Sequence, residues 1–491
     1  MYSTFTGLEL ANSALRTQQA ALNVTGHNIA NANTKGYSRQ IPGITTSSPV
    51  TFNSVGRKLT MGTGSILGEV ERARNSYIDN QYRWESSKYE YWTEMQNTLQ
   101  LIEGVVNEPT DYSLSNDLNQ FWNAWSELAN NPENTGARDV LKERALILVD
   151  SFHRVDRQFT DLAQELNENV RVLVNQINDY AKQIIELNGQ IKRAEVAMDN
   201  PNDLEDQRDL LVDKIAQFVP VKVEKVRDPS FTDRDVYTFK LTIGDHELVN
   251  DQKSTPLGLS QDENGYWQVD GLSKVEKEMG RLPAVLELRD NYLAEQIKEF
   301  DSLAKTLAKV VNAIHKKGQG LEALGTPDKG LDFFVDDPSG GGITAKTISL
   351  NQALVDDTKR IATGKISATL DVGDNEIALA IASLGQGISQ EIRETYFNGD
   401  DPLDGVPSIG DLYGAIVATM GVDVQKAERM AEGQSVLVNH MANQRESYSG
   451  VSLDEEMTNL IKFQKSYSAA ARLVTILDSM FDRIMSMGVT R

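Results

Sequence analysis

Apolar residues recur at intervals of three and four along the last forty residues of the chain, which is the spacing of a coiled-coil seam. Ser452 and Glu455 form a capping box before this repeat, and Gly488 is suited to end the helix. Neither Gly nor Pro interrupts the residues between them. The predicted seam consists of Leu453, Glu456, Leu460, Phe463, Tyr467, Ala470, Val474, Leu477, Phe481 and Ile484, all apolar except Glu456.

A second helical repeat lies at the N-terminus, where Thr6 and Glu9 form another capping box. Its apolar positions are Leu8, Ala11, Leu15, Leu22 and Ile29, with the small Ala14 and Ala21 alongside. This helix should end within the stretch NIANANTKGYSRQ, residues 28–40.

The asparagines of that stretch invite a structural interpretation. Asn28, Asn31 and Asn33 are expected to tolerate a left-handed backbone and to cap free carbonyls, and Gly36 permits a tight turn. The chain could thereby leave an inner helical layer and run outward. An ordinary helix end in an asparagine-rich loop is the alternative that these residues leave open.

Long helices are predicted for much of the middle of the chain. One seam keeps helical spacing from Leu141 to Ile191, and shorter repeats run over 78–102 and 118–128. Trp84, Trp92, Trp122 and Trp125 fall within these helices, where core positions are expected. A further helix is predicted from about Pro283 to Lys317, and helices resume near Ser408.

The period of the pattern changes to two after Phe218, which predicts strands. Gly244-Asp245 and Asn264-Gly265 are turn pairs between short alternating runs. The predicted fold class is therefore mainly α, with paired terminal coiled-coil helices, a long helical-bundle body and an inserted β-rich (α+β) domain. The expected terminal domain comprises 1–50 with 450–491, and the expected helical rod comprises 51–215 with 283–330 and 408–449. The β-rich insert is expected at 216–282, and 331–407 is expected to be a mixed segment packed with that insert.

Charge is distributed unevenly along the 491 residues, whose net charge is −22. Residues 1–50 carry a net +2 and residues 453–491 are neutral, so the body carries the negative charge. This distribution favours ends that pack against copies of themselves and a body that faces water; the alternative is that the acidic composition serves solubility alone. It disfavours nucleic acid and anionic membranes as partners, and no apolar run is long enough to span a membrane.

Few sequence features indicate catalysis or cofactor binding. The absence of cysteine rules out disulfides, thiol catalysis and cysteine-based metal sites. The five histidines, His27, His153, His246, His315 and His440, are widely separated and are expected at surfaces or helix ends. We therefore expect no catalytic, cofactor-binding or metal site, and no enzyme activity. A binding module or hydrolase carried by the β-rich insert is the alternative from another functional class.

The two terminal helices need partners, because an isolated helix is marginally stable until an apolar face is buried. The stripe at 6–33 complements the seam at 453–484, so the termini are expected to pair as an antiparallel hairpin. One such pair cannot cover every face, so neighbouring subunits should cover the rest. In the free molecule we expect both ends to be largely disordered.

The two terminal motifs are similar to those of the bacterial flagellar rod, hook and hook-associated axial proteins. They are NIANANTKGYSRQ and SLDEEMTNLIKFQKSYSAAARLVTILDSMFDRIM, residues 28–40 and 452–485. Many members have Pro where Lys35 stands. Three internal segments are similar to the hook–filament junction members of this family: SNDLNQFWNAWSELANNPENTGARDVLKERALIL (115–148), NDLEDQRDLLVDKI (202–215) and LELRDNYLAEQIKEFDSLAKTLAKVVNAIHKKG (286–318).

The resemblance implies an extracellular structural subunit of the hook–filament junction, exported by the flagellar type III apparatus without signal cleavage. Its implied partners are copies of itself in a ring, hook protein below, a second junction protein above and an export chaperone on the C-terminal helix, with neither nucleic acid nor membrane insertion. A hook or rod subunit is the alternative within this class. The expected assembly interface comprises Leu8, Leu15, Leu22, Asn28, Ile29, Asn31, Asn33, Gly36, Tyr37, Leu453, Leu460, Phe463, Tyr467, Val474, Leu477, Phe481 and Ile484.

Overall fold

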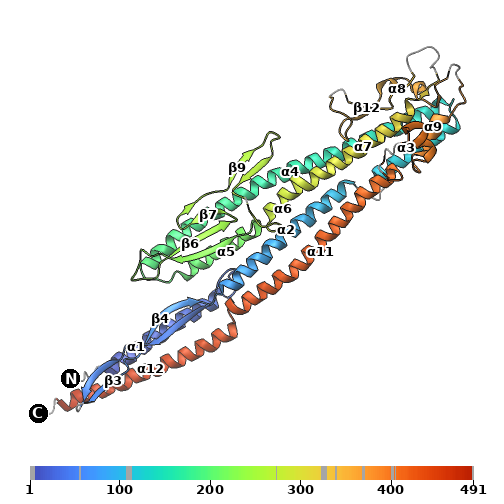
Figure 1. Cartoon of the computed structure of the whole chain (residues 1–491). Coiled ribbons are helices and arrows are strands. Elements are labelled where there is room, and N and C mark those ends of the chain that lie inside the picture. The colour runs from blue at the N-terminus through green and yellow to red at the C-terminus, as the bar shows by residue number, and fades with distance from the viewer. Residues whose placement is uncertain are drawn as a thin grey trace.

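The protein is an elongated helical rod with the two chain ends at one tip (Figure 1). The computed structural model describes residues 6–54, 57–106, 113–272, 274–321, 329–337, 340–367, 371–399, 403 and 405–488. The outermost parts of the predicted terminal domain, 1–5 and 489–491, lie outside these residues. The mainly α class predicted from the sequence is confirmed.

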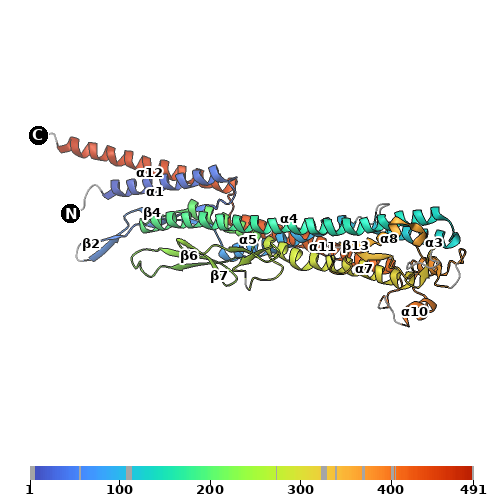
Figure 2. The ribbon, with the colours of Figure 1, turned by 90° about the horizontal axis from the view of Figure 1, so that it is seen from above.

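The long helices lie side by side in the rod (Figures 1 and 2). Helix α2 packs along α11, and α4 packs against α3, α5, α6 and α7. Helix α4 has 62 residues and is therefore roughly 90 Å long. The principal helices are α1 (Thr6–Asn31), α2 (Ser76–Val106), α3 (Leu114–Asn130), α4 (Thr135–Val196), α5 (Asn202–Phe218), α6 (Arg281–Glu287), α7 (Leu293–His315), α11 (Ile409–Ser449) and α12 (Leu453–Gly488), with a π-helical turn at Leu288–Tyr292 between α6 and α7.

The seam predicted between Leu141 and Ile191 lies within α4 and supplies much of the core, as the sequence predicts. Trp92, Trp122 and Trp125 are buried in that core. The core position expected for Trp84 is wrong, because its side chain is 40% exposed. It lies beside the edge of the β-rich insert, in a surface hollow with Val221 and Met279.

Strands occupy the segment between α1 and α2, where the sequence pattern assigned helical rod from residue 51. Two antiparallel ribbons form here, β1 with β4 and β2 with β3, and the helical part of the rod begins at Ser76. The ribbon of β1 and β4 packs against α1. The strands are β1 (Gln40–Thr46), β2 (Val50–Ser54), β3 (Arg57–Met61) and β4 (Ser65–Arg72).

The insert holds an antiparallel sheet in the order β5-β6-β7-β8 and a separate β9–β10 hairpin. Phe239, Leu241 and Ile243 alternate along β6 and are buried, as the period of two predicts. Gly244-Asp245 forms the turn into β7, also as predicted. The strands are β5 (Lys222–Arg227), β6 (Tyr237–Ile243), β7 (His246–Asn250), β8 (Lys253–Ser254), β9 (Gly258–Gln261) and β10 (Trp267–Asp270).

Three asparagines of α4 bind the backbone of the insert and fix its orientation along the rod. Asn188 donates to the Asp251 carbonyl at 2.7 Å. Asn178 accepts from the Leu257 amide at 2.9 Å and donates to the Leu257 carbonyl at 3.0 Å. Asn167 accepts from the Trp267 amide at 2.7 Å and donates to the Gly265 carbonyl. We name these three side chains the asparagine ladder.

The segment between α7 and α11 packs against α3, α4 and α7 at the rod tip opposite the chain ends, and not with the β-rich insert as the sequence analysis predicted (Figure 1). Phe121 and Trp125 of α3 contact Phe333, which also contacts the ring of His315. The elements of this segment are β11 (Gly318–Gln319), β12 (Phe334–Asp336), β13 (Ile348–Leu350), α8 (Gln352–Asp356), a 3-10 turn at Thr358–Arg360, β14 (Gly364–Lys365), α9 (Glu376–Ser383) and α10 (Gln390–Phe397).

His315 ends α7, as expected, but it is buried rather than at the surface. Its Nδ1 donates to the Leu331 carbonyl at 2.7 Å, and its Nε2 accepts from the Ala362 amide at 3.0 Å. Burial lowers its pKa from 6.5 to about 4, so the folded protein holds the neutral ring. His315 thus joins two stretches of this segment, at Leu331 and at Ala362, to the end of α7.

Removing one member of the asparagine ladder should loosen the β9–β10 hairpin. Asn178→Ala leaves the amide and carbonyl of Leu257 without their partner, which costs about 1–3 kcal/mol. Faster amide exchange in β9 and β10 should report this loss. Asn175→Ala, on an exposed position of the same helix, is the matched control. Equal exchange in the two variants would contradict a clamping role.

The buried His315 should make the protein less stable in acid. The unfolded side chain takes up a proton near pH 6.5, whereas the folded one does so only near pH 4. Unfolding free energy should therefore decrease as pH falls from 6.5 to 4, by roughly 3 kcal/mol in total. Stability curves of wild type and His315→Asn should differ in slope over this range, while His440→Asn, at an exposed position of α11, keeps the wild-type slope. Parallel curves for wild type and His315→Asn would refute the assignment.

Candidate assembly surface

The first and last helices, α1 and α12, pack together as an antiparallel hairpin that extends beyond the rod (Figures 1 and 2). The pairing predicted from the sequence is therefore present within one subunit. Most half-buried positions of α12 belong to the predicted seam: Leu460, Phe463, Tyr467, Val474, Leu477 and Phe481. Ala470 of the same seam is buried, and the Leu477 side chain lies against Gly7.

The most deeply buried face of α1 is small and polar rather than leucine-rich. Its buried positions are Ala11, Thr17, Ala21, Thr25 and Asn28, while Leu8, Leu15, Leu22 and Ile29 are half-buried at its flank. Helix α1 packs against both α12 and the β1–β4 ribbon, so short side chains allow close approach on two sides. Thr17, for example, donates its hydroxyl to the Ser65 carbonyl of β4 at 2.8 Å.

Apolar side chains also remain exposed on α12, outside the seam. Leu473, Ile476, Met480 and Ile484 are 38%, 55%, 54% and 56% exposed, and their spacing places them on one flank of the helix. We name these four residues the outer stripe. Ile484 was predicted in the seam, but it lies at the exposed end of this flank. Leu453, at the start of the helix, is 49% exposed.

Asn28 connects the end of α1 to the strand that follows. Its side chain accepts from the Gln40 amide at 2.9 Å and donates to the Gln40 carbonyl at 2.8 Å, as a neighbouring strand would. The same amide group also donates to Glu456 at 3.1 Å, and the Tyr37 hydroxyl donates to Asn28 at 2.8 Å. The segment therefore folds back on α1 through one buried side chain.

The prediction of a left-handed backbone at Asn28, Asn31 and Asn33 is wrong. Within the described residues, positive φ in this stretch occurs at Gly36, at 85°, where an added Cβ would lie 3.3 Å from Leu210. Asn31 ends the helix, donating to the His27 carbonyl and accepting from the Thr34 hydroxyl. Asn33 is exposed. Asn28 and Asn31 thus act through their side chains, not their backbone conformation, and Asn31 caps a carbonyl as predicted.

The start of α12 is bound to the same fold-back through Glu456. Arg39 donates to its carboxylate at 2.8 Å, and the Glu456 side chain is only 3% exposed. Arg39 also pairs at 2.7 Å with Glu455, whose side chain is 61% exposed. The Arg39 amide donates to the Ser449 carbonyl at the end of α11. The break between α11 and α12 is therefore fixed against β1.

Helix α5 presents a row of carboxylates that bind two segments: the residues after α1 and the residues at the end of β4. Asp206 accepts from the Ser38 amide at 2.7 Å and from its hydroxyl at 2.8 Å. It also pairs with Arg72 at 2.7 Å. Further ion pairs extend this arrangement to α2 and α11, and we name the whole set the charged joint: Arg72, Arg74, Arg83 and Arg445 with Glu205, Asp206, Asp209 and Asp213.

The charges of the joint are held ionised by one another. Burial alone would raise the pKa of Asp209, but Arg74, Arg72 and Arg83 hold it well below its usual range. Burial, followed by the charges of Asp203, Asp206 and Glu456, raises the pKa of Tyr37, so its hydroxyl stays a donor. A charge removed from this set would leave its partner unpaired inside the protein.

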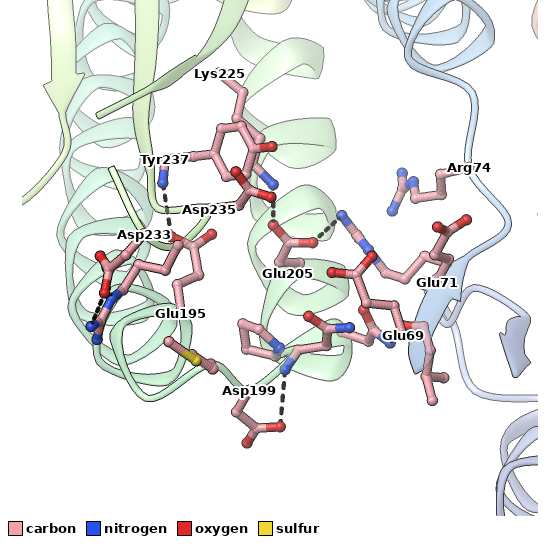
Figure 3. Close-up of a pocket in the computed structure, with 17 residues that line it drawn as sticks. Glu69, Glu71, Arg74, Glu195, Asp199, Glu205, Lys225, Asp233, Asp235 and Tyr237 are labelled. Carbon is pink, nitrogen blue, oxygen red and sulfur yellow. Dashed lines mark hydrogen bonds and ion pairs between the residues drawn. The ribbon is translucent and has the colours of Figure 1, made fainter. Parts of the chain in front are cut away.

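An open hollow of about 610 Å³ lies beside the joint, between β4, the end of α4, the start of α5 and the β5–β6 pair (Figure 3). Glu205 pairs there with Arg72 and with Lys225, both at 2.7 Å, and Glu195 accepts from the Tyr237 amide at 2.9 Å. Its mostly charged lining differs from the apolar pockets that hold small-molecule cofactors. Within the described part of the chain, neither a cluster of metal ligands nor a helix suited to cross a membrane is present.

Sequence reasoning missed the charged joint, although two signals pointed to this region. One signal, Glu456 as the one charged member of an otherwise apolar seam, pointed to the neighbouring pair with Arg39. The carboxylates at 205, 206, 209 and 213 recur at helical spacing within the NDLEDQRDLLVDKI segment. Their partners Arg72 and Arg74 lie more than a hundred residues away, and no local pattern identifies them.

Comparisons with known proteins match both terminal helices and the helical rod to flagellar protein families. The model described as "Flagella basal body rod protein" matches residues 8–37, and the model described as "Flagellar basal body rod FlgEFG protein C-terminal" matches 442–487. These two matches cover the terminal hairpin and define the class as flagellar axial proteins. The model described as "Flagellar hook-associated protein FlgK helical domain" matches residues 99–334.

Full-length relatives narrow the class. Flagellar hook-associated protein 1 of Bacillus subtilis (strain 168) is 30% identical over 529 residues, covering 100% of this chain and 99% of that protein. Flagellar hook-associated protein 1 of Salmonella typhimurium (strain LT2) is 27% identical over 562 residues, covering 97% and 99%. The chain belongs to the family of flagellar hook-associated protein 1.

A solved structure shows the same fold at low sequence identity. The flagellar hook junction protein FlgK from Burkholderia pseudomallei superposes with a TM-score of 0.60 at 16% identity, covering 75% of this chain and 100% of that one.

Removal of one carboxylate from the charged joint should lower the stability of the protein strongly. Asp206→Asn leaves Arg72 and Arg74 under-neutralised in a buried site, which costs about 3–5 kcal/mol. Native-state hydrogen exchange of α5 should show this loss of stability. Asp235→Asn removes a surface carboxylate that pairs with Arg227 and should change stability by less than about 1 kcal/mol. Similar values for the two variants would show that the joint contributes no more than a surface pair.

Proposed function

We propose that this protein is the extracellular structural subunit of the hook–filament junction, assembled through its terminal helices. The single observation that carries the proposal is the hairpin of α1 and α12 with its outer stripe left exposed. The family membership supports the place in the flagellum. The subunit would act mechanically rather than as an enzyme, with the rod as its body.

The two faces of α12 would have different roles in assembly. The seam residues at 460–481 hold α12 on α1 within the subunit. The outer stripe is free to contact the terminal helices of neighbouring copies in a ring. Burying its four apolar side chains would contribute on the order of 1.5–3 kcal/mol each. Without those neighbours, the hairpin beyond the joint would be largely disordered.

The other proposed partners follow from the proposed position of the protein between hook and filament. Hook protein would lie below the ring and a second hook-associated protein above it. Export would proceed through the flagellar type III apparatus without signal cleavage. An export chaperone on the C-terminal helix would have to bind the seam residues, since these are its best apolar anchors. The chaperone and α1 would therefore compete for one face of α12.

We keep the terminal domain, the rod and the β-rich insert of the expected division, with the β1–β4 segment assigned to the terminal domain and the segment between α7 and α11 assigned to the far tip of the rod. The terminal domain would form the inner layer of the junction and the rod its outer wall. The β-rich insert would be a structural part of that outer wall rather than an independent module, because the asparagine ladder binds it to α4.

An acidic residue in the outer stripe should block assembly. Ile476→Asp places a charge where a neighbour would bury an isoleucine, so junctions should be reduced at least about tenfold, with the subunit still exported. Leu477→Asp should also abolish junctions, because it separates α12 from α1, while leaving the body folded. Junctions are counted by electron microscopy, and unassembled subunit is measured in the medium.

The matched control is Ser479→Asp, at an exposed position on another side of α12. It should assemble normally. Normal filaments on cells carrying Ile476→Asp would show that the outer stripe is not an assembly surface.

A further inference from the structure

The fold-back after α1 and the first turn of α12 are bound to the rod by contacts within one chain. Three consecutive backbone amides there donate to partners far along the sequence or across the fold-back: Ser38 to Asp206, Arg39 to Ser449, and Gln40 to Asn28. The Gln40 side chain also donates to Asp203 at 2.7 Å. None of these bonds needs a second copy of the protein.

Glu456 extends the same arrangement to the other terminal helix. It is 2% exposed and receives Arg39 and Asn28. Its amide donates to the Ser452 carbonyl, which closes the first turn of α12. We name this set the anchor: Asn28, Ser38, Arg39, Gln40 and Glu456, with Asp206 as its attachment to α5.

The helical arms beyond the anchor are held differently. Helix α12 packs on α1 through half-buried residues, and the outer stripe lies exposed towards its free end. Beyond Glu456, the hydroxyls of Thr458, Ser468 and Thr475 donate back to carbonyls one turn earlier in the same helix rather than to another element. The α12 arm therefore depends on apolar burial, part of which needs a neighbour, whereas the α1 arm also bonds to β4 through Thr17.

Starting a helix is the slow and unfavourable step of helix formation. The first turn costs about a thousandfold in equilibrium constant, whereas each later residue adds one hydrogen bond. In this protein that first turn of α12 and the last turn of α1 are both part of the anchor. A helix growing outward from them avoids the nucleation step.

We infer that the anchor is ordered in the free subunit and is the nucleus from which both terminal helices form when a neighbouring copy covers the outer stripe. This inference rests on the proposed function and deepens it. It divides each predicted disordered end into an ordered inner part, at 28–40 and 452–456, and an outer part that folds on assembly. Buried, mutually bonded polar groups hold the inner part, because opening them would leave charges unpaired inside the protein.

Amide hydrogen exchange of the full-length monomer, resolved by mass spectrometry of peptides, tests the inference. Peptides that contain 38–40 and 456–460 should exchange at least about tenfold more slowly than peptides from 8–20 and 465–486. Fast exchange at all four would overturn the anchor while leaving the proposed junction role standing. Slow exchange at all four would overturn growth from a nucleus, because the arms would already be folded.

Two neighbouring glutamates provide a matched pair of variants. Glu456→Gln removes the buried partner of Arg39, and exchange at 38–40 should accelerate at least about tenfold with the thermal unfolding of the rod unchanged. Glu455→Gln removes its exposed partner and should have little effect. Equal exchange in the two variants would overturn the inference. Ser38→Ala, which removes one hydroxyl bond to Asp206, gives the same readout if Glu456→Gln fails to fold.

The variants also separate this inference from the assembly role. Glu456→Gln should slow the appearance of junctions without changing the contacts of the outer stripe, whereas Ile476→Asp should leave exchange at 38–40 unchanged. Loss of protection at 38–40 in Ile476→Asp would contradict an anchor that forms independently of the arms.

Discussion

The buried ion pairs between α5 and the arginines of the β4–α2 segment determine how the terminal hairpin is joined to the rod. Arg72 and Arg74 lie just before α2, and Asp206 and Asp209 lie on α5. Burial of such charges is costly unless each finds its partner, so the arrangement allows one geometry of these segments. That geometry determines where α1 ends, where β1 begins and where α11 gives way to α12.

The remainder of the molecule follows from this fixed joint. On one side, the long helices and the asparagine ladder make the rod and its β-rich insert one packed body. On the other side, a hairpin of two helices extends with little support of its own. The apolar surface of α12 exceeds what α1 covers, as the exposure of Ile476 and Met480 shows. A packed body and an incompletely covered hairpin are the two features on which the proposed junction role depends.

The long helices could be predicted from the sequence because each has a dominant packing face. The α4 seam and the α12 seam both gave a clear period, and both lie where the pattern placed them except at the two ends of the α12 seam, where Leu453 and Ile484 are exposed. Helix α1 was predicted as a helix, but its buried face was not. It packs between two neighbours, so Thr17 and Thr25 are buried where a search for large apolar residues selects Leu15 and Leu22.

The charged joint could not be predicted, because charged residues in a sequence are normally read as solvated. Asp206 and Arg72 acquire their role only when the fold brings them within 2.7 Å. The asparagines at 28, 31 and 33 were noticed, but turn statistics suggested backbone roles rather than the side-chain bonds that Asn28 makes. The β1 and β4 strands are as long as β6 but have no alternating buried face, so their sequence shows no period of two.

The central claim is that neighbouring copies cover the outer stripe while the seam stays on α1. Because the chain has no cysteine, a single Ile476→Cys substitution gives a clean probe. Its rate of alkylation should be high in the free subunit and strongly reduced in assembled junctions, whereas Ser479→Cys should react in both. Equal alkylation of Ile476→Cys in the free and assembled protein would contradict the account.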